Sequence, residues 1–425
     1  MTGIGPVPAG GTTAGPATRG RLTERHVLAL GLAVSAAFIV AATAAAVAMV
    51  TAGGSPWAPI HLALAGAATV AIGTFMPHFA VTLAGTRPEA PAQRLAALAL
   101  LATGAALAVV GVTLVGGSWA ALGAAVSLGG LALVTWETLV PLRDPLARRH
   151  HVVTVAYAVA LLELAGGIAI GGMGAAGVDT VTQAWATLRA SHTWLTLFGA
   201  VSLTIFATLV YLAPTVNGAR IRAGATLVIG TAGMLLGPIM VAAGFGLAIR
   251  PVVLGGLALT LAGSLAQVAY ALDAYRRRGR FTTEHDWRRV AVGHLSAGPG
   301  WFAAAAMVAT FEIALGRPLA GWSIGTLAVP MIAGWMLQEL VGSWTHLLPS
   351  VTPGSPATHA SQRRILAIAS LPRLIAWNVG VALAWMGLGF DLVVLAVPGA
   401  GLLTASVGFS VLLLARALLA RGASG

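Results

Sequence analysis

The sequence predicts an all-α protein that crosses a lipid bilayer about twelve times. Of its 425 residues, 58% are hydrophobic and only 8% are charged, whereas about a quarter of the residues in soluble domains are charged. Apolar windows of about 20 residues, the length that spans a bilayer as a helix, recur along the chain. A loose internal period of about 134 residues is typical of a repeated multi-helix unit. Together these observations predict three units of four membrane-spanning helices.

Twelve stretches have the length and hydropathy of a membrane-spanning helix. They cover about 27–51, 58–84, 93–115, 118–141, 152–173, 190–214, 223–248, 251–274, 290–315, 323–349, 364–388 and 391–415. Residues 1–26, rich in Gly, Pro, Thr and Ala, are expected to form a disordered cytoplasmic tail. Residues 27–415 form the expected membrane domain, and residues 416–425 a short cytoplasmic tail. The first apolar stretch exceeds the roughly 7–15 apolar residues of a signal peptide, which favours an uncleaved span.

Arginine residues set the expected orientation in the membrane. Most of them lie in the linkers that follow the even-numbered stretches, whereas the other linkers carry only Arg189, Arg250 and Arg317. The positive-inside rule therefore places both termini in the cytoplasm of a multi-pass plasma-membrane protein. The net charge of +12 comes from these short linkers, so we expect no nucleic-acid partner. The arginine-rich linker 275–289 sets the topology and is also suited to contact anionic lipid headgroups.

The internal period rests on three apolar stretches that lie in the second, sixth and tenth predicted spans. They are residues 61–85, 192–218 and 334–354. Gly66 in the first stretch matches Gly199 in the second, and Pro214 in the second matches Pro349 in the third, each one period further along the chain. Equivalent positions in such a repeat are expected at equal depth in the membrane.

The absence of cysteine limits the cofactors that the chain is able to hold. Without thiolates there are no disulfides, no Cys-ligated iron–sulfur clusters, no covalently attached c-type haem and no Cys-bound copper. A metal or haem would be held by histidine, carboxylate or methionine. The sequence also lacks a phosphate-binding loop, a nucleophile elbow and an HExxH motif.

Five histidines lie within predicted spans, where ionisable side chains are costly and mark candidate functional sites. His61 and His192 sit at the outer starts of two spans, which makes an outer layer. His78 and His346, two periods apart in the chain, sit near two inner ends, and His294 lies at the same inner level. Each layer is a candidate for haem b or copper ligation, and hydrogen bonding to backbone carbonyls is the alternative. We expect His78 and His346 to be the ligand pair, because twice the period separates them.

Buried carboxylates and an arginine form a second set of candidates. Glu339 lies seven residues before His346 and near the expected depth of Arg373. Glu339 and Arg373 either form an ion pair between adjacent helices, or Arg373 faces a haem propionate or quinone while Glu339 lies on a proton path. Glu163, in the middle of a span without an evident partner, is a second proton-path candidate. The remaining histidines, expected in solvated loops, are His150, His151, His285 and His359.

Three sets of four helices with histidines on the second, sixth and tenth spans resemble haem–copper oxidase subunit I. Residues 57–85 and 191–221 look closer to the multi-span membrane region that precedes copper nitrite reductase or multicopper-oxidase-like domains in some actinobacterial proteins. The oxidase family has a His-His pair on span 7 and a His-x-His on span 10. Here span 7 has no histidine and span 10 has only His346. The resemblance therefore does not imply the oxygen-reducing haem–copper centre, and the cupredoxin domains with their copper ligands are absent.

These features lead to one expected function and two alternatives. The two histidine layers and the resemblance indicate a membrane protein with b-type haem that passes electrons from quinol to an external cupredoxin, another copper protein or a cytochrome. Spans interrupted by Gly and Pro within an internal repeat are also typical of a solute or ion transporter. A structural membrane subunit without cofactors is the third possibility. Whether the chain catalyses a reaction is left open.

The topology is directly testable. A reporter fused after Gly425 is expected to read cytoplasmic, because the positive-inside rule places the C-terminus there. A reporter inserted at Gly177, in a linker poor in arginine, is expected to read external. The reverse result at either position would contradict the count of twelve spans.

Overall fold

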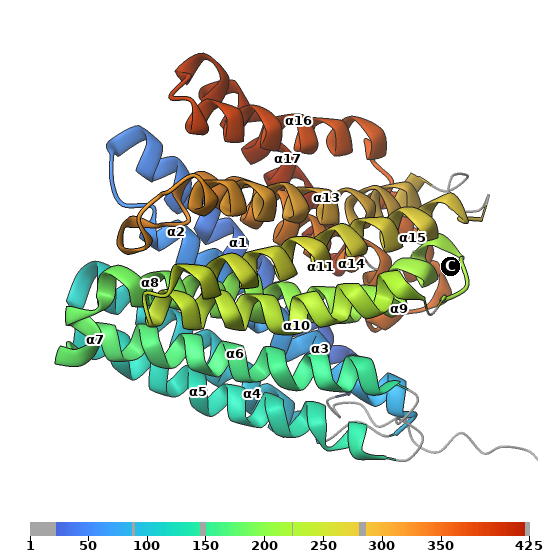
Figure 1. Cartoon of the computed structure of the whole chain (residues 1–425). Coiled ribbons are helices and arrows are strands. Elements are labelled where there is room, and N and C mark those ends of the chain that lie inside the picture. The colour runs from blue at the N-terminus through green and yellow to red at the C-terminus, as the bar shows by residue number, and fades with distance from the viewer. Residues whose placement is uncertain (1–22, 87–89, 145–149, 223, 280–285, 421–425) are drawn as a thin grey trace, which may run out of the picture.

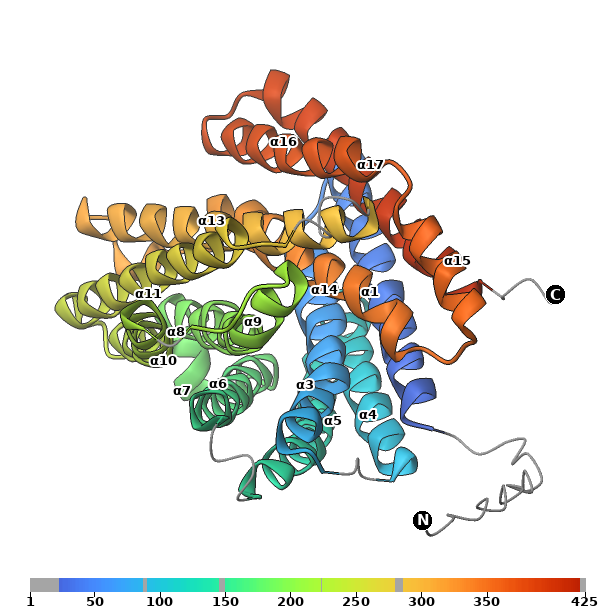
Figure 2. The same cartoon turned by 90° about the vertical axis from the view of Figure 1, so that its right-hand side faces the viewer.

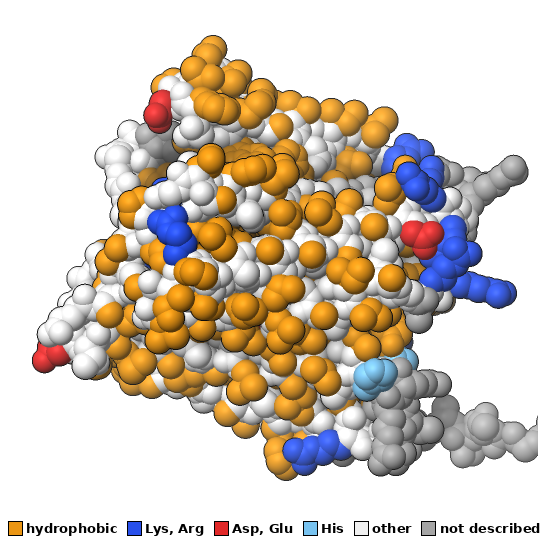
Figure 3. Space-filling view, in the orientation of Figure 1, with side chains coloured by type: hydrophobic (Ala, Val, Ile, Leu, Met, Phe, Trp, Pro, Cys, Tyr) orange, Lys and Arg blue, Asp and Glu red, His pale blue; other side chains and the backbone are white. Residues whose placement is uncertain are grey.

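The protein is a bundle of long helices that lie side by side (Figure 1). The computed structural model describes residues 23–86, 90–144, 150–222, 224–279 and 286–420, and no strand occurs among them. Ten of the helices in these ranges are long and apolar enough to cross a membrane. Figure 3 shows hydrophobic side chains over the middle of the molecule in this view, with arginine side chains mostly toward its ends. The chain is therefore a polytopic helical membrane protein.

Several membrane-crossing rods consist of more than one helical segment. In four of them a π-helical segment, marked η here, is continuous with α-helix. The helices in chain order are α1 (Glu24–Ala52), α2–η1–α3 (Trp57–Ala84), α4–η2 (Pro91–Val115), α5 (Gly117–Leu139), α6 (His151–Ala175), α7 (Asp179–Gln183), α8–η5–α9 (Trp185–Asn217), α10 (Ala225–Gly246), α11 (Arg250–Arg276), α13 (Asp286–Ala314), η8–α14 (Val329–Val351), α15 (Pro356–Leu366), α16 (Ser370–Gly389) and α17 (Val393–Leu419). The tail expected over residues 1–26 lies mostly outside the described residues, as does His285.

Two of the twelve expected spans are not among the ten apolar helices. The spans expected at 290–315 and 323–349 correspond to α13 and η8–α14, which are long helices. Figure 2 places α14 at the centre of the bundle, between α1, α3, α9 and α13. A helix surrounded by protein is able to carry polar side chains that a lipid-facing helix cannot. The lower hydropathy of α14 is consistent with this interior position.

The span expected at 364–388 begins later than predicted. Residues Pro356–Leu366 form the separate helix α15, and α16 begins only at Ser370. Ala369, between them, has a φ of 50°, a left-handed conformation that breaks the helix. The arginines expected at the inner start of this span therefore lie on α15.

Glycines bring the backbones of three helix pairs into direct contact. A Cβ atom on Gly123 of α5 would lie 2.6 Å from the Gly104 carbonyl oxygen of α4. A Cβ atom on Gly256 of α11 would lie 2.6 Å from the Val241 nitrogen of α10, and Gly399 of α17 packs as closely on α16. Such small-residue contacts drive association in lipid, where apolar side chains gain nothing from leaving the solvent. The pairs α4–α5, α10–α11 and α16–α17 are therefore tight hairpins.

A π-helical segment recurs in three of the central rods. These segments are η1 (Leu62–Ala68), η5 (Trp194–Val201) and η8 (Val329–Met336). Successive segments begin about one repeat period apart, in agreement with the period found in the sequence. π-helical turns are rare and frequently occur at functional sites. Each segment adjoins the α-helix that runs to the inner end of its rod: α3, α9 or α14.

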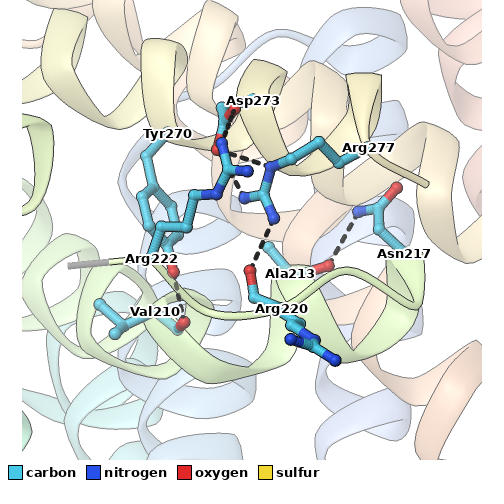
Figure 4. Close-up of polar contacts among 8 residues, drawn as sticks. All are labelled: Val210, Ala213, Asn217, Arg220, Arg222, Tyr270, Asp273 and Arg277. Carbon is cyan, nitrogen blue, oxygen red and sulfur yellow. Dashed lines mark hydrogen bonds and ion pairs between the residues drawn. The ribbon is translucent and has the colours of Figure 1, made fainter. Parts of the chain in front are cut away.

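Polar contacts at the inner end tie the rod that ends in α9 to α11 (Figure 4). Arg277 donates to Asp273 with its Nε and Nη2 atoms, at 3.0 and 2.5 Å, and to the Arg220 carbonyl at 2.8 Å. The Tyr270 hydroxyl donates to the Val210 carbonyl at 2.7 Å. These bonds fix the arginine-rich loop after α9 against the end of α11, where the positive-inside rule predicts the cytoplasm.

Adjacent glycines on α11 provide a test of the hairpin contact. Gly256→Ala is expected to destabilise the protein by about 1–3 kcal/mol, because the added methyl group overlaps the α10 backbone. Gly255→Ala is the control: its Cβ atom would meet only the Met240 side chain, at 3.5 Å. That change is expected to be neutral or mildly stabilising, since alanine favours helix over glycine. Thermal melts in detergent that showed equal losses for both variants would contradict the close contact.

Candidate functional site

The structure brings the two outer histidines together. The rings of His61, at the end of α2, and His192, on α8, lie 6.2 Å apart between centroids and only 10° from parallel. The Trp57 ring stacks on the His61 ring, with centroids 3.8 Å apart. The two histidines come from different rods, about one repeat period apart in the chain. Their proximity is therefore a property of the fold and not of local sequence.

Backbone carbonyls hold both rings in one tautomer. His61 Nδ1 lies 2.8 Å from the Trp57 carbonyl oxygen, and His192 Nδ1 lies 2.7 Å from that of Gly167. A carbonyl oxygen only accepts, so each Nδ1 carries the proton and each neutral ring keeps its lone pair on Nε2. No hydrogen bond to either Nε2 occurs within the described part of the chain. An Nδ1–H bonded to a carbonyl is the usual support of a metal-ligating histidine.

The spacing of the rings matches a pair of imidazoles on one metal. Metal–nitrogen bonds of about 2.0–2.1 Å, with roughly 1 Å from ring nitrogen to ring centre, put two opposed centroids about 6 Å apart. The observed 6.2 Å agrees with that value. Imidazole nitrogen suits iron and copper. The centroid spacing of His61 and His192 is therefore the value expected of two opposed imidazoles on one metal.

Neither of two hollow regions of the protein adds to this site. The central cavity between α3, α9 and α14 and the groove between α1 and α17 have neither histidine in their walls. The described residues contain no group of three or more His, Cys, Asp or Glu side chains that could hold a metal ion. Among the described residues, His61 and His192 therefore form a pair of imidazoles without a further metal-ligating side chain beside them.

The expected pair His78 and His346 is not brought into ring contact. His78 lies 3.5 Å from Glu24 and packs edge-on against Phe79. His346 stacks on Trp287 of α13, with centroids 6.1 Å apart. Both are half-buried and lie in the C-terminal halves of α3 and α14. Equal depth did not make them neighbours, because the two rings are directed toward different helices.

His78 belongs to an ionic cluster at the inner end of the first helices. Arg94 of α4, only 2% exposed, donates to Glu24 Oε1 at 2.6 Å and to the Thr74 carbonyl at 2.7 Å. Its Nε lies 3.5 Å from Glu137 of α5. The cluster joins α1, α3, α4 and α5. The cluster was not predicted from the sequence, although an arginine at the start of an apolar stretch is a signal of pairing.

His294 lies in a fully buried polar network between α13, α14 and α16. Its Nδ1 is 2.9 Å from Gln338 Oε1, and Gln338 Nε2 donates to Asn378 Oδ1 at 3.1 Å. Trp301 Nε1 donates to the same Asn378 oxygen at 2.8 Å. The edge of the His294 ring meets Trp377. The Nε2 of His294 has no hydrogen-bond partner among the described residues. The metal-ligating role expected of His294 stays a prediction.

Glu339 and Arg373 do not form the expected ion pair within the described ranges. Arg373, 5% exposed, donates to the Leu366 carbonyl, at the point where α15 ends. Glu339 is 2% exposed and neither of its carboxyl oxygens has a hydrogen-bond partner among the described residues. Its side chain instead lines the central cavity. Arg373 therefore caps a carbonyl group at the C-terminal end of α15, whereas the Glu339 side chain faces the cavity between the central helices.

Glu163 is a second buried carboxyl without a partner in the described structure. It lies on α6, 3% exposed, and its carboxyl group packs against Gly199 of η5, where a Cβ atom would come within 2.7 Å. Phe38 and Trp301 pack in the same way against Gly66 and Gly334 of the other π-helical segments. Glu163 thus packs against the π-helical segment of one central rod, where an aromatic side chain packs against the corresponding segment of each of the other two.

No protein family and no curated protein sequence matches this chain. The candidate site is therefore defined by its own geometry: two neighbouring histidines from different rods, and two buried carboxyls that have no partner among the described residues.

The ionic cluster provides a stability prediction. Arg94→Met is expected to cost about 3–5 kcal/mol, because it leaves buried carboxylate groups without their cation. Adding Glu24→Gln to this variant removes one of the stranded charges, so the double variant is expected to melt higher than Arg94→Met alone. Arg222→Met, on a mostly exposed arginine, is the control with little expected effect. A double variant less stable than the single one would show that Arg94 does not neutralise Glu24.

Proposed function

We propose that this membrane protein holds a transition metal between His61 and His192 and uses it to transfer electrons near the outer end of the bundle. The observation that carries the proposal is the pair of nearly parallel imidazoles, 6.2 Å apart, each with Nδ1 fixed by a backbone carbonyl. Haem b iron and a copper ion are the two candidates that this donor pair suits. When bound, the metal supplies one-electron redox chemistry.

The position of the site supports electron exchange with a partner outside the membrane. His61 is the last residue of α2, four residues after its start, so it lies within about 6 Å of the helix end along the axis. The predicted orientation puts this end on the outer side. A cupredoxin or cytochrome in the external compartment is the partner that fits such a position, and membrane quinol is the proposed electron source.

The residues around the site hold the histidines rather than react themselves. Trp57 covers one face of His61, and Gly171 of α6 leaves room beside the His192 ring, since a Cβ atom there would come within 3.1 Å of it. The rods that carry the histidines differ by one unit of the proposed three-unit repeat, which the recurring π-helical segments and glycine hairpins support. The proposed plasma-membrane location follows from the same topology.

A second candidate is ion movement through the bundle. The cavity between α3, α9 and α14 has a volume of about 70 Å³, which suits water or a small ion and not an organic solute. Flux of monovalent cations into liposomes that contain the purified protein would support this function. A protein that neither binds metal nor conducts ions would be a structural membrane subunit.

Spectroscopy and metal analysis test the proposed metal site. Protein expressed with ample haem precursor and copper is expected to show either a low-spin haem spectrum or stoichiometric copper. His61→Ala and His192→Ala are each expected to abolish that signal at matched protein amount, because each change removes one of the two donors on which the signal depends.

His78→Ala and His346→Ala serve as matched controls, since both change a half-buried histidine at the inner end. They are expected to retain the signal. If the signal is lost in His78→Ala and His346→Ala but kept in His61→Ala and His192→Ala, the metal ligands are His78 and His346, the pair expected from the sequence. Wild-type protein without haem and without copper would contradict the proposal.

A further inference from the structure

The central cavity is lined by polar groups on two of its walls. α14 contributes Glu339 and Ser343, and α9 contributes Thr204 and Thr208, while apolar side chains form the remaining surface. A water molecule occupies about 30 Å³ in the liquid and needs two to four polar partners. The cavity of about 70 Å³ therefore has room for about two water molecules beside the Glu339 carboxyl.

Glu339 is the unusual group in this cavity. It is 2% exposed, and within the described ranges neither oxygen of its carboxyl group has a hydrogen-bond partner. An unpaired carboxylate in a low-dielectric interior is costly, so such a group tends to hold a proton or to gain a partner. Gly298 of α13 packs directly against the Glu339 carboxyl. The space for a hydrogen-bond partner of this carboxyl is therefore the cavity, whose wall includes Glu339.

Hydroxyl groups continue from the cavity wall toward the inner end. The Thr208 hydroxyl donates to the Thr204 carbonyl at 2.8 Å, and the hydroxyl of Tyr157, on α6, lies 2.9 Å from Thr208 Oγ1. Tyr157 is 1% exposed, so this contact is shielded from lipid and water. One turn further along α9, the Tyr211 hydroxyl lies 2.6 Å from His150 Nδ1. His150, expected in a solvated loop, is half-buried beside the start of α6.

We propose that Glu339 is a proton-binding site that exchanges its proton with the inner surface through cavity water and the hydroxyls of Thr208 and Tyr157. The step moves only a proton: the carboxyl O–H bond breaks, an O–H bond forms on water, and the negative charge stays on the carboxylate. Hydroxyl groups suit the relay because each both donates and accepts. His150 with Tyr211 forms the inner end of this line of polar groups.

This site does not depend on the proposed metal. Its proton exchange is a property of the carboxyl and the cavity, and a colourless protein without metal would still show it. Failure of the metal site and failure of the proton site are therefore separate results.

Glu163 is the matched control for Glu339. Both are buried carboxyls without partners in the described structure, but Glu163 packs on Gly199 and is absent from the cavity wall. A carboxyl that is only buried should exchange its proton slowly, whereas one that faces a hydrated cavity should exchange quickly. Comparing the two acids thus distinguishes the effect of burial on proton exchange from the effect of contact with water.

Infrared spectroscopy of the full-length protein in lipid nanodiscs tests the proposal. After transfer to D₂O, the wild-type band of protonated carboxyl groups is expected to shift in a fast and a slow component. Glu339→Gln should remove the fast component and Glu163→Gln the slow one, since glutamine keeps the shape of each side chain and cannot ionise. The proposal would be overturned if Glu339→Gln kept the fast component, or if its spectrum contained every carboxyl band of the wild type.

The relay has its own pair of variants. Thr208→Val and Tyr157→Phe remove one hydroxyl each and are expected to slow the fast component at least tenfold. Thr135→Val is the control, because the Thr135 hydroxyl donates to the carbonyl four residues earlier at 2.8 Å, as that of Thr208 does, but lies outside the cavity wall. Equal exchange rates in Thr208→Val, Tyr157→Phe and wild type would exclude the relay.

Discussion

Close approach of backbones at glycine is the interaction on which the rest of this bundle depends. In lipid, a helix gains nothing by turning apolar side chains toward another helix, so dispersion contacts between well-fitted surfaces must hold the bundle together. The hairpins α4–α5, α10–α11 and α16–α17 achieve this fit at positions such as Gly123, Gly256 and Gly399. These hairpins lie beside the central rods. The polar groups of the protein are consequently concentrated on helices that other helices cover, where their desolvation is offset by hydrogen bonds or by a cavity.

Much of the fold was predictable because bilayer thickness dictates the length of apolar stretches. The ten apolar helices agree with ten of the expected spans to within a few residues. Hydropathy was less informative for α13 and α14, since an interior helix does not have to be apolar throughout. The π-helical segments were also missed, because their extra residue per turn leaves no mark on composition. Only the recurring glycines, Gly66 and Gly199, pointed to the positions where they occur.

The sequence placed the histidines along their helices but not around them. Counting residues located each histidine near one end of its helix. Which helix face a side chain occupies depends on helix packing, which the period does not contain. For this reason the rings of His61 and His192 lie near each other, whereas those of His78 and His346 contact other residues. The Tyr157–Thr208 contact was invisible for the same reason: its partners lie 51 residues apart on helices whose relative rotation is set by packing.

Each π-helical segment changes which way the side chains of the second half of its rod point relative to those of the first half. Each turn of the segment holds more residues than the 3.6 of an α-helix, so the segment changes the angular phase between the outer and inner halves of its rod. In the rod that carries His192, the histidine precedes η5 and the cavity residues Thr204 and Thr208 come after it. Loss of one residue within the segment would turn the inner half by about 100° relative to the outer half. Sequence change on one side of such a segment is able to adjust the His61–His192 pair without moving the cavity wall, so the two ends of one rod are free to evolve separately.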